Sequence, residues 1–228
     1  LGLLIFTIGP MIASFYFSFT KFPLLRAPEW IGLRNYVSMF TQEEHFHDEW
    51  AKSIDVDDIN VDIFFTCPSC PENNIIRSWL GDIRGKRVLE LGCGAGEASV
   101  FLAKQGAEVT ATDISGEMLL VATRLAQKNG VTIATEKALS HDLPFPDNSF
   151  DIVYCANLLH HVDLEETVSE VRRVLVDGGV FVAWEPLAHN PVINVYRKMA
   201  DQVRTADEHP LTMSQIKSIK KYFQSVET

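Results

Sequence analysis

The chain has 228 residues and a formal net charge of −10, with 46% hydrophobic and 22% charged residues. This length accommodates one α/β domain plus an extension, and the acidic balance argues against a nucleic-acid backbone as the main partner. The four cysteines are scattered, which excludes the regular spacing of a disulfide framework.

The first segment, Leu1–Phe19, is almost continuously apolar and carries no charged residue before Lys21. A run of this length is sufficient for one helix to cross a bilayer. It lacks the basic start and small-residue cleavage site of a signal peptide. We therefore expect an N-terminal apolar helix, with membrane contact through residues 1–20.

The stretch SFTKFPLLRAPEWIGLRNYVSMF follows this run. Its elements Ser18-Phe19-Thr20 and Gly32-Leu33-Arg34-Asn35-Tyr36 resemble the start of an ABC-transporter permease subunit of the sugar-uptake type. Residues 1–41 thus form a permease-like segment, whose weakly basic charge contrasts with the acidic remainder. Three interpretations are open: a joined or truncated gene fragment, a membrane anchor, or a buried helix, which the length of the run disfavours.

Residues 42–84 are expected to form a helical extension that precedes the main domain. We predict a short helix over Phe46–Ile54 and another over Glu72–Leu80, where apolar residues recur on one face. The pair Cys67 and Cys70 has no second ligand pair at zinc-site spacing and no thioredoxin-like context. We interpret it as incidental.

Residues 85–228 alternate between strand-like and helix-like patterns, which predicts a parallel, doubly wound α/β sheet. Strands are expected at 86–91, 108–113, 131–135, 150–155 and 180–184, and helices at about 97–105, 115–129, 163–175 and 216–222. A sixth strand is expected to begin at Phe223.

The most informative stretch is Val88–Gly96, an apolar strand followed by an acid and three alternating glycines. Glycines let the backbone approach a ligand closely, and Asp113, at the end of the next strand, is placed to bind ribose hydroxyls. The spacing is GxGxG, and Glu97 stands where a dinucleotide would bring its pyrophosphate. Glu90 suits a cationic ligand, so an adenosine-type cofactor without phosphate is indicated.

Four motifs in this order resemble a class I S-adenosylmethionine-dependent methyltransferase: VLELGCGAG, TDIS, LPFPDNSFDIVYCANLLHHV and EVRRVLVDGGVFVAWEP. The resemblance covers about residues 46–228. It implies a Rossmann-like sheet, S-adenosyl-L-methionine as cofactor, and methyl transfer to a small-molecule or lipid acceptor by in-line displacement. The family closes its sheet with an antiparallel seventh strand, for which no residues remain, so an incomplete sheet with an exposed edge is expected.

The resemblance also implies which residues bind the cofactor. Residues expected around the methionine half are Glu90, Gly92, Cys93, Gly94 and Gly96, with Cys93 present for its small size. Asp113 is expected on the ribose, although it is also placed to cap the following helix. Residues expected near the adenine are Ile114, Met118, His141 and Asp142. The family's usual acid is replaced by Leu139, so Ser140 is a further candidate for the adenine contact.

Asn157, just beyond the fourth strand, is expected at the cofactor and the reacting centre. His161 is the favoured candidate for a general base, and His160 is the second. In the competing interpretation, the histidines of this Leu-His-His-Val turn serve only packing and capping. We expect no metal site, because adjacent histidines do not share a helix face. Further residues expected to line the acceptor side are Glu185, His189, Asn190 and Tyr196.

Other functions stay open at this point. The chain could bind the cofactor without turnover, because the last strand is missing. A transport function carried by the permease-like fragment is disfavoured, because one membrane helix cannot form a translocation path. A nicotinamide-dependent oxidoreductase is disfavoured by the glycine spacing and by Glu97. The cofactor is made inside the cell, so we expect the enzyme domain in the cytoplasm, with or without a membrane anchor. The sequence specifies neither the acceptor nor the oligomeric state.

Overall fold

The computed structural model describes residues 20–21, 29–30, 44–67, 71–188 and 210–226. The chain divides into two compact units, residues 1–50 and residues 51–228. In the first unit, β1 (Thr20–Lys21) pairs antiparallel with β2 (Glu29–Trp30). The apolar helix expected over Leu1–Phe19 lies outside the described residues. Among the helices that are described, none combines the length and apolarity needed to cross a membrane.

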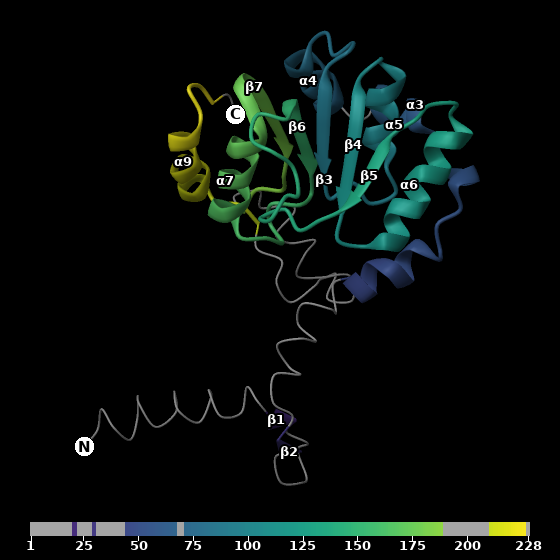
Figure 1. Cartoon of the computed structure of the whole chain (residues 1–228), viewed down its shortest axis with the longest axis horizontal. Coiled ribbons are helices and arrows are strands. Elements are labelled where there is room, and N and C mark those ends of the chain that lie inside the picture. The colour runs from purple at the N-terminus through teal and green to yellow at the C-terminus, as the bar shows by residue number, and fades with distance from the viewer. Residues whose placement is uncertain (1–19, 22–28, 31–43, 68–70, 189–209, 227–228) are drawn as a thin grey trace. The chain divides into compact units, whose positions relative to one another are not determined.

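The second unit is built on a five-stranded parallel sheet (Figure 1). Its strands are β3 (Arg87–Leu91), β4 (Glu108–Asp113), β5 (Ala134–Lys137), β6 (Phe150–Ala156) and β7 (Leu175–Trp184). Their spatial order is β5-β4-β3-β6-β7. The chain direction along the sheet therefore reverses beside β3, which creates a switch point between β3 and β6. This arrangement confirms the predicted doubly wound α/β fold.

Helices cover both faces of the sheet (Figure 1). They are η2 (Val56–Asp58), α3 (Val61–Thr66), α4 (Pro71–Leu80), α5 (Glu97–Lys104), α6 (Gly116–Lys128), α7 (Leu164–Val174), α9 (Met213–Ile219) and η3 (Lys220–Tyr222). Residues 44–51 are also helical. The core contacts place α3, α4, α5 and α6 on one face, and α7 and α9 on the other.

The helix boundaries follow from capping. The Ser115 hydroxyl accepts a hydrogen bond from the Met118 amide (3.0 Å) at the start of α6, and the Asp163 carboxylate accepts one from the Glu166 amide (2.9 Å) at the start of α7. Each bond satisfies an amide that has no partner within its helix. Gly130, with φ of 69°, ends the turn that follows α6.

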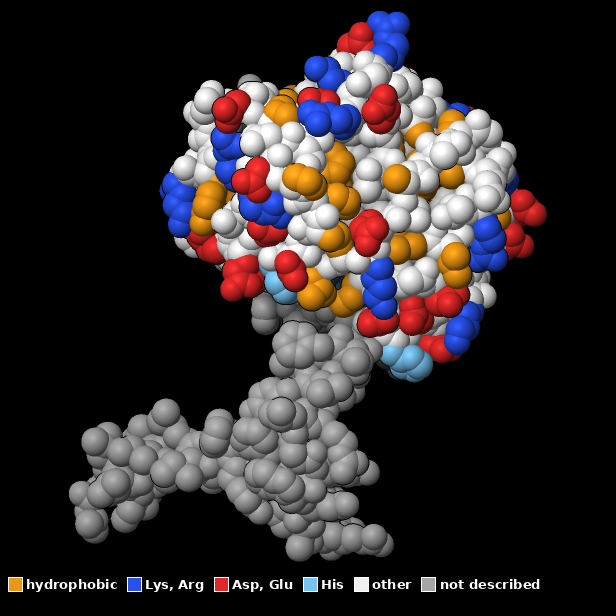
Figure 2. Space-filling view, in the orientation of Figure 1, with side chains coloured by type: hydrophobic (Ala, Val, Ile, Leu, Met, Phe, Trp, Pro, Cys, Tyr) orange, Lys and Arg blue, Asp and Glu red, His pale blue; other side chains and the backbone are white. Residues whose placement is uncertain are grey.

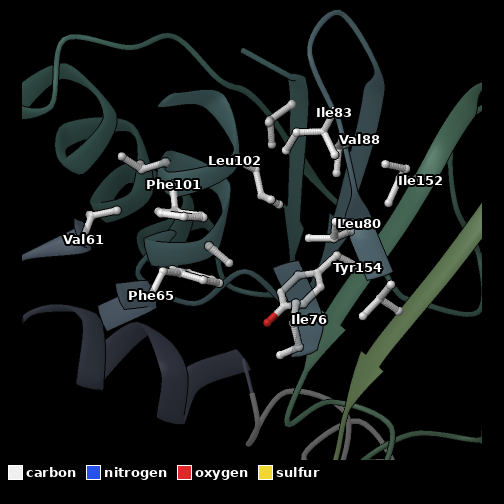
Figure 3. Close-up of a cluster of buried hydrophobic side chains, with 14 of the residues drawn as sticks. Val61, Phe65, Ile76, Leu80, Ile83, Val88, Phe101, Leu102, Ile152 and Tyr154 are labelled. Atoms are coloured by element: carbon white, nitrogen blue, oxygen red, sulfur yellow. The ribbon is translucent and has the colours of Figure 1, made fainter. Parts of the chain in front are cut away.

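Figure 3 shows the core on the α4 and α5 face of the sheet. Phe65 of α3 stacks on Phe101 of α5, with ring centroids 4.2 Å apart, and Tyr154 of β6 lies in the same cluster. Burial of this apolar surface supplies the main stabilisation of the unit. Residues 51–84 therefore pack as part of the same compact unit as the sheet.

The opposite core joins the odd-numbered residues of β3 to α7, with Leu89, Leu91 and Val168 fully buried. At its border Phe223 stacks on Phe181 of β7, with centroids 5.8 Å apart. The strand expected to begin at Phe223 is therefore wrong for 223–226, because this side chain anchors a coil against the sheet after η3. Among the described strands, β7 is the outermost on this side.

The third predicted strand is displaced from its expected place. We expected residues 131–135, whereas β5 spans Ala134–Lys137 and all four of its residues are exposed. Val131 donates its amide hydrogen to the Ala126 carbonyl and so completes the end of α6. Val131 and Ile133 pack against the core from this loop. Their apolar pattern therefore reflects loop burial, while the edge strand itself is polar.

The surface of the described residues mixes charges of both signs. On the face seen in Figure 2, acidic and basic side chains alternate with small apolar patches, without a continuous basic area. Several exposed charges form local pairs, such as Arg84 with Asp82 (2.7 Å) and Arg172 with Asp177 (2.8 Å). Such exposed pairs contribute little to stability.

Candidate cofactor and acceptor site

All five strands of the sheet end at one edge because they run parallel. At this edge, beside the switch point, lie the glycine loop after β3 (residues 92–96), Asp113 at the end of β4 with Ile114 after it, and the turn after β6. In open α/β sheets ligands bind at this place. Most of the site residues expected from the sequence therefore meet at this edge.

The glycine loop adopts a backbone that only glycine takes without strain. Gly92, Gly94 and Gly96 have φ of 63°, 51° and 85°. A Cβ at Gly96 would lie 2.5 Å from Ala122 Cβ, whereas a Cβ at Gly94 would meet no atom within 4 Å. Gly96 thus allows α5 and α6 to approach closely, and Gly94 leaves open space above the loop. Cys93 is buried between these glycines.

Asp113 holds the loop in place from the end of β4. Its Oδ2 accepts the Gly94 amide hydrogen and its Oδ1 accepts that of Ser115, both at 2.9 Å. The residue is buried, with 7% of its surface exposed. The capping interpretation is therefore correct in part, because Asp113 orders both the glycine loop and the start of α6. A role toward ribose hydroxyls stays a prediction.

Glu90 is a buried carboxyl beneath the glycine loop, with 4% of its surface exposed. It accepts a hydrogen bond from the Ser99 hydroxyl of α5. Burial, with smaller contributions from the charges of Glu97 and Asp113, raises its pKa to about 8. Burial likewise raises the pKa of Glu97. Three acids thus converge on one loop, and a cationic ligand bound there would favour the ionised form of Glu90.

The residues expected near the adenine are placed less uniformly. Ile114 is partly exposed beside Asp113, whereas Met118 is fully buried in a core cluster with Ala95 and Val121. His141 and Asp142 are exposed on the loop after β5. As placed here, Met118 offers no surface to a ligand, so its adenine contact stays a prediction. Ser140 instead shares a hydrogen bond with Thr167 of α7 (3.0 Å).

The turn after β6, residues 157–161, is held by a contact that sequence reasoning missed. Both Leu158 and Leu159 donate their amide hydrogens to Oε1 of Glu185 (2.8 Å each). The other carboxylate oxygen of Glu185, Oε2, lies 2.7 Å from Nδ1 of His160. Glu185 follows β7, so this carboxylate joins the ends of two neighbouring strands. We call residues 157–161 the histidine turn.

The histidine turn faces two regions. Toward the glycine loop, Leu158 occupies the space beside Gly92, where an added Cβ would lie 3.0 Å from Leu158 Cδ1. Asn157 is exposed and has a positive φ of 55°. Its backbone N–H donates a hydrogen bond to the Trp184 carbonyl. A non-glycine residue in this conformation is uncommon and marks a constrained turn.

On its other side the histidine turn borders a pocket of about 460 Å³, which we call the α7 pocket. Its lining residues are Leu159, His160, His161, Val162, Asp163, Leu164, Glu165, Gln215 and Ser218. The rings of His160 and His161 lie 4.1 Å apart between centroids. A slightly larger cavity of about 520 Å³ lies before β3, around Ile83 and Arg84, and thus away from the carboxyl edge.

The remaining sequence expectations fall partly outside the described residues. These include Cys70, His189, Asn190 and Tyr196. Within the described ranges, no group of three or more potential metal-binding side chains converges.

Comparison with known proteins identifies the type of domain. Residues 89–183 match a family model described as a methyltransferase domain. The uncharacterized methyltransferase YcgJ of Bacillus subtilis is 35% identical over 121 residues, which make up 52% of this chain and 48% of that protein. The crystal structure of YcgJ superposes with a TM-score of 0.56 at 28% identity, covering 65% of this chain and 64% of the other.

Two relatives have names that indicate the kind of molecule they act on or help to make. A ubiquinone biosynthesis O-methyltransferase of Photorhabdus laumondii is 37% identical over 119 residues, 51% of this chain and 49% of the relative. A sterol 24-C-methyltransferase of Gibberella zeae is 40% identical over 106 residues, 44% of this chain and 28% of the relative. This chain spans about half the length of the first curated relatives it matches.

These matches support the expected methyltransferase domain over residues 89–183. The cofactor that such a domain implies is S-adenosyl-L-methionine. They give no support to the permease resemblance of residues 1–41.

Proposed function

We propose that this protein transfers a methyl group from S-adenosyl-L-methionine to a small-molecule or lipid-like acceptor. The observation that carries this proposal is the junction of the glycine loop with Glu90 and Asp113 at the switch point of the sheet. The methyltransferase-domain match over residues 89–183 covers the same elements.

The residues present fit this cofactor. Gly94 leaves open space above the loop, and the acids Glu90, Glu97 and Asp113 suit a ligand that carries a sulfonium and an ammonium but no phosphate. We assign Glu90 and the glycine loop to the methionine half, Asp113 to the ribose and Ile114 to the adenine. The cofactor supplies an activated methyl group, so positioning of the acceptor contributes much of the rate.

For the acceptor we propose the region between the histidine turn and α7. The α7 pocket has the size of a small-molecule site and is bordered by the histidine turn, whose Leu158 also lies beside Gly92 of the glycine loop. The named relatives act on a ubiquinone precursor and on a sterol, which supports an acceptor of small-molecule or lipid-like kind. The cytoplasm, where the cofactor is made, is the proposed location of the reaction. A membrane contact through residues 1–20 stays a prediction.

The test is calorimetric titration of the full chain with S-adenosyl-L-methionine. We expect micromolar binding in the wild type and its loss in Asp113→Ala. Asp177→Ala, which removes an exposed carboxyl near the start of β7, is the matched control and should bind as the wild type does.

Thermal unfolding of each variant separates lost binding from lost structure, because Asp113 also orders two backbone segments. A folded wild-type protein that binds NADH but not S-adenosyl-L-methionine would contradict the proposal. Binding without methylation of any acceptor would favour the alternative of an inactive cofactor-binding protein.

A further inference from the structure

We propose that the Tyr154 hydroxyl donates a hydrogen bond to the carboxylate in the methionine half of the cofactor. This inference rests on the proposed function and deepens it, because it adds a cofactor contact outside the glycine loop and the histidine turn. Tyr154 is thereby the residue that distinguishes S-adenosyl-L-methionine from a ligand that lacks this carboxylate.

Tyr154 carries a buried hydroxyl within an apolar cluster. The residue belongs to β6, packs in the core on the α4 and α5 face of the sheet, and has 3% of its surface exposed. Throughout the described ranges, no group forms a hydrogen bond with this hydroxyl. Buried polar groups in native proteins are nearly always hydrogen-bonded, and an unpaired one is unfavourable. The partner of the Tyr154 hydroxyl is therefore expected to be a ligand.

The position of Tyr154 places this hydroxyl near the proposed cofactor site. Tyr154 lies opposite Glu90 in the pairing of β3 with β6. Glu90 reaches Ser99 of α5, and Tyr154 packs in the same α4 and α5 core, so both side chains leave the same face of the sheet. Tyr154 stands two residues, about 7 Å, before the end of β6 at the carboxyl edge.

The orientation of the ring agrees with this position. Figure 3 shows the Tyr154 ring beside Ile76 of α4, with the hydroxyl oxygen toward the arrowheads of the strands. The arrowheads mark the carboxyl edge, where the glycine loop leaves β3. The hydroxyl is thus directed to the edge at which the cofactor is proposed to bind.

The charges around Tyr154 keep its hydroxyl a donor. Among the described residues, the ionisable groups that act on it are Glu90, Cys155 and Glu185, none of which is basic. Burial, followed by the charge of Glu90, raises the pKa of Tyr154 above its ordinary value. The hydroxyl therefore keeps its proton at neutral pH and can donate it in a hydrogen bond.

The chemistry of the ligand requires a donor at this place. The ammonium and the carboxylate of a methionine are bonded to one carbon, so the groups that bind them must lie close together. Glu90 suits the ammonium, but a second acid beside it would repel the carboxylate. A neutral donor beside Glu90 binds the carboxylate without this repulsion, and its hydrogen bond is strengthened by the ligand's charge. Tyr154 is such a donor.

Calorimetric titration of the full chain tests the contact from both sides. Tyr154→Phe removes only the hydroxyl. The ligands are S-adenosyl-L-methionine and its decarboxylated analogue, S-adenosyl-3-methylthiopropylamine, which keeps the sulfonium and the amine. We expect Tyr154→Phe to bind S-adenosyl-L-methionine at least about tenfold more weakly than the wild type does. Both proteins should bind the decarboxylated analogue equally well.

Either of two results in these titrations would overturn the proposal. Unchanged affinity of Tyr154→Phe for S-adenosyl-L-methionine would show that the hydroxyl does not contact the cofactor. An equal loss for both ligands would show that it contacts a part other than the carboxylate. Tyr222→Phe is the matched control, because its hydroxyl donates to Glu165 of α7 (3.0 Å). Its affinity for both ligands should equal that of the wild type.

Thermal unfolding without ligand gives a second readout and shows that the variant folds. Removal of an unpaired buried hydroxyl costs no hydrogen bond, so Tyr154→Phe should unfold at the same temperature as the wild type or at a higher one. A clearly lower midpoint would show that the hydroxyl is already paired in the free protein, and it would overturn the proposal.

The wild-type titration separates this inference from the proposed function. Failure of the wild type to bind S-adenosyl-L-methionine refutes the proposed function. Normal binding by the wild type, together with the same affinity in Tyr154→Phe, refutes only the role of Tyr154.

Discussion

Glu90 provides a prediction whose size follows from its surroundings. Its pKa is raised to about 8 by burial, with the charges of Glu97 and Asp113 adding to the effect. In the unfolded chain the carboxyl titrates near its ordinary value of 4.5. Between these values the folded protein holds a proton that the unfolded chain has released, so stability falls as the pH rises toward 8.

The slope is about 1.4 kcal/mol per pH unit for one proton. Between pH 5.5 and 7.5 the wild type should therefore lose about 3 kcal/mol relative to Glu90→Gln, whose amide does not titrate. Urea unfolding of both proteins at the two pH values measures this difference. Glu108→Gln, at the exposed start of β4, is the control. If wild type and Glu90→Gln change in parallel, Glu90 is not protonated in the folded state and the reasoning is refuted.

The same proton couples to the cofactor. A cationic ligand beside Glu90 favours the ionised carboxylate, so binding near neutral pH should release up to one proton from the wild type and less from Glu90→Gln. Titration of S-adenosyl-L-methionine in two buffers of different ionisation enthalpy counts the protons. Equal release from both proteins would show that Glu90 does not face the ligand's charge.

Three further predictions concern packing. Gly96→Ala should destabilise the protein by about 2–4 kcal/mol in urea unfolding, because its Cβ would meet Ala122 at 2.5 Å. Gly94→Ala places its Cβ in open space, so it should cost only about 1 kcal/mol of stability. Its main effect should be weaker cofactor binding. Phe65→Ala should cost about 3–5 kcal/mol, because this fully buried ring stacks on α5; a loss below about 1 kcal/mol would contradict its place in the core. Arg173→Lys should lower the thermal midpoint and speed proteolysis of residues 143–147, since its guanidinium donates to two of their carbonyls; unchanged proteolysis would show that this clamp is dispensable.

Much of the fold follows from the sequence for an identifiable reason. The predicted bounds of the strands at β3, β4 and β6 agree with the structure within one residue, because each is a largely buried run closed by glycine, aspartate or a turn. β5 was misplaced because it is an exposed edge strand without a hydrophobic signal. The sixth strand failed because Phe223 is apolar for contact with Phe181, not for pairing in the sheet.

The sequence predicts those parts of the site that a local motif determines. It does not predict the contacts that depend on how β6 and β7 pair in the sheet. The glycine loop and Asp113 are local, and the structure brings them together. The bond between His160 and Glu185 joins residues 25 positions apart. It depends on the pairing of β6 with β7, which places Ala156 opposite Trp184. The sequence marked both residues as candidates, but it gave no sign that they are partners.

The strand order also has a consequence for how the chain folds. β3 is first of the five in sequence but central in space, with Arg87 paired to Glu108 on one side and bound to Asp151, 64 residues away, on the other. Closing the longer loop costs about 1 kcal/mol more in chain entropy. We therefore expect β3, β4 and β5 to associate first, leaving one flank of β3 open until β6 arrives. During synthesis, we expect that open flank to be a place where the chain can associate wrongly with other chains.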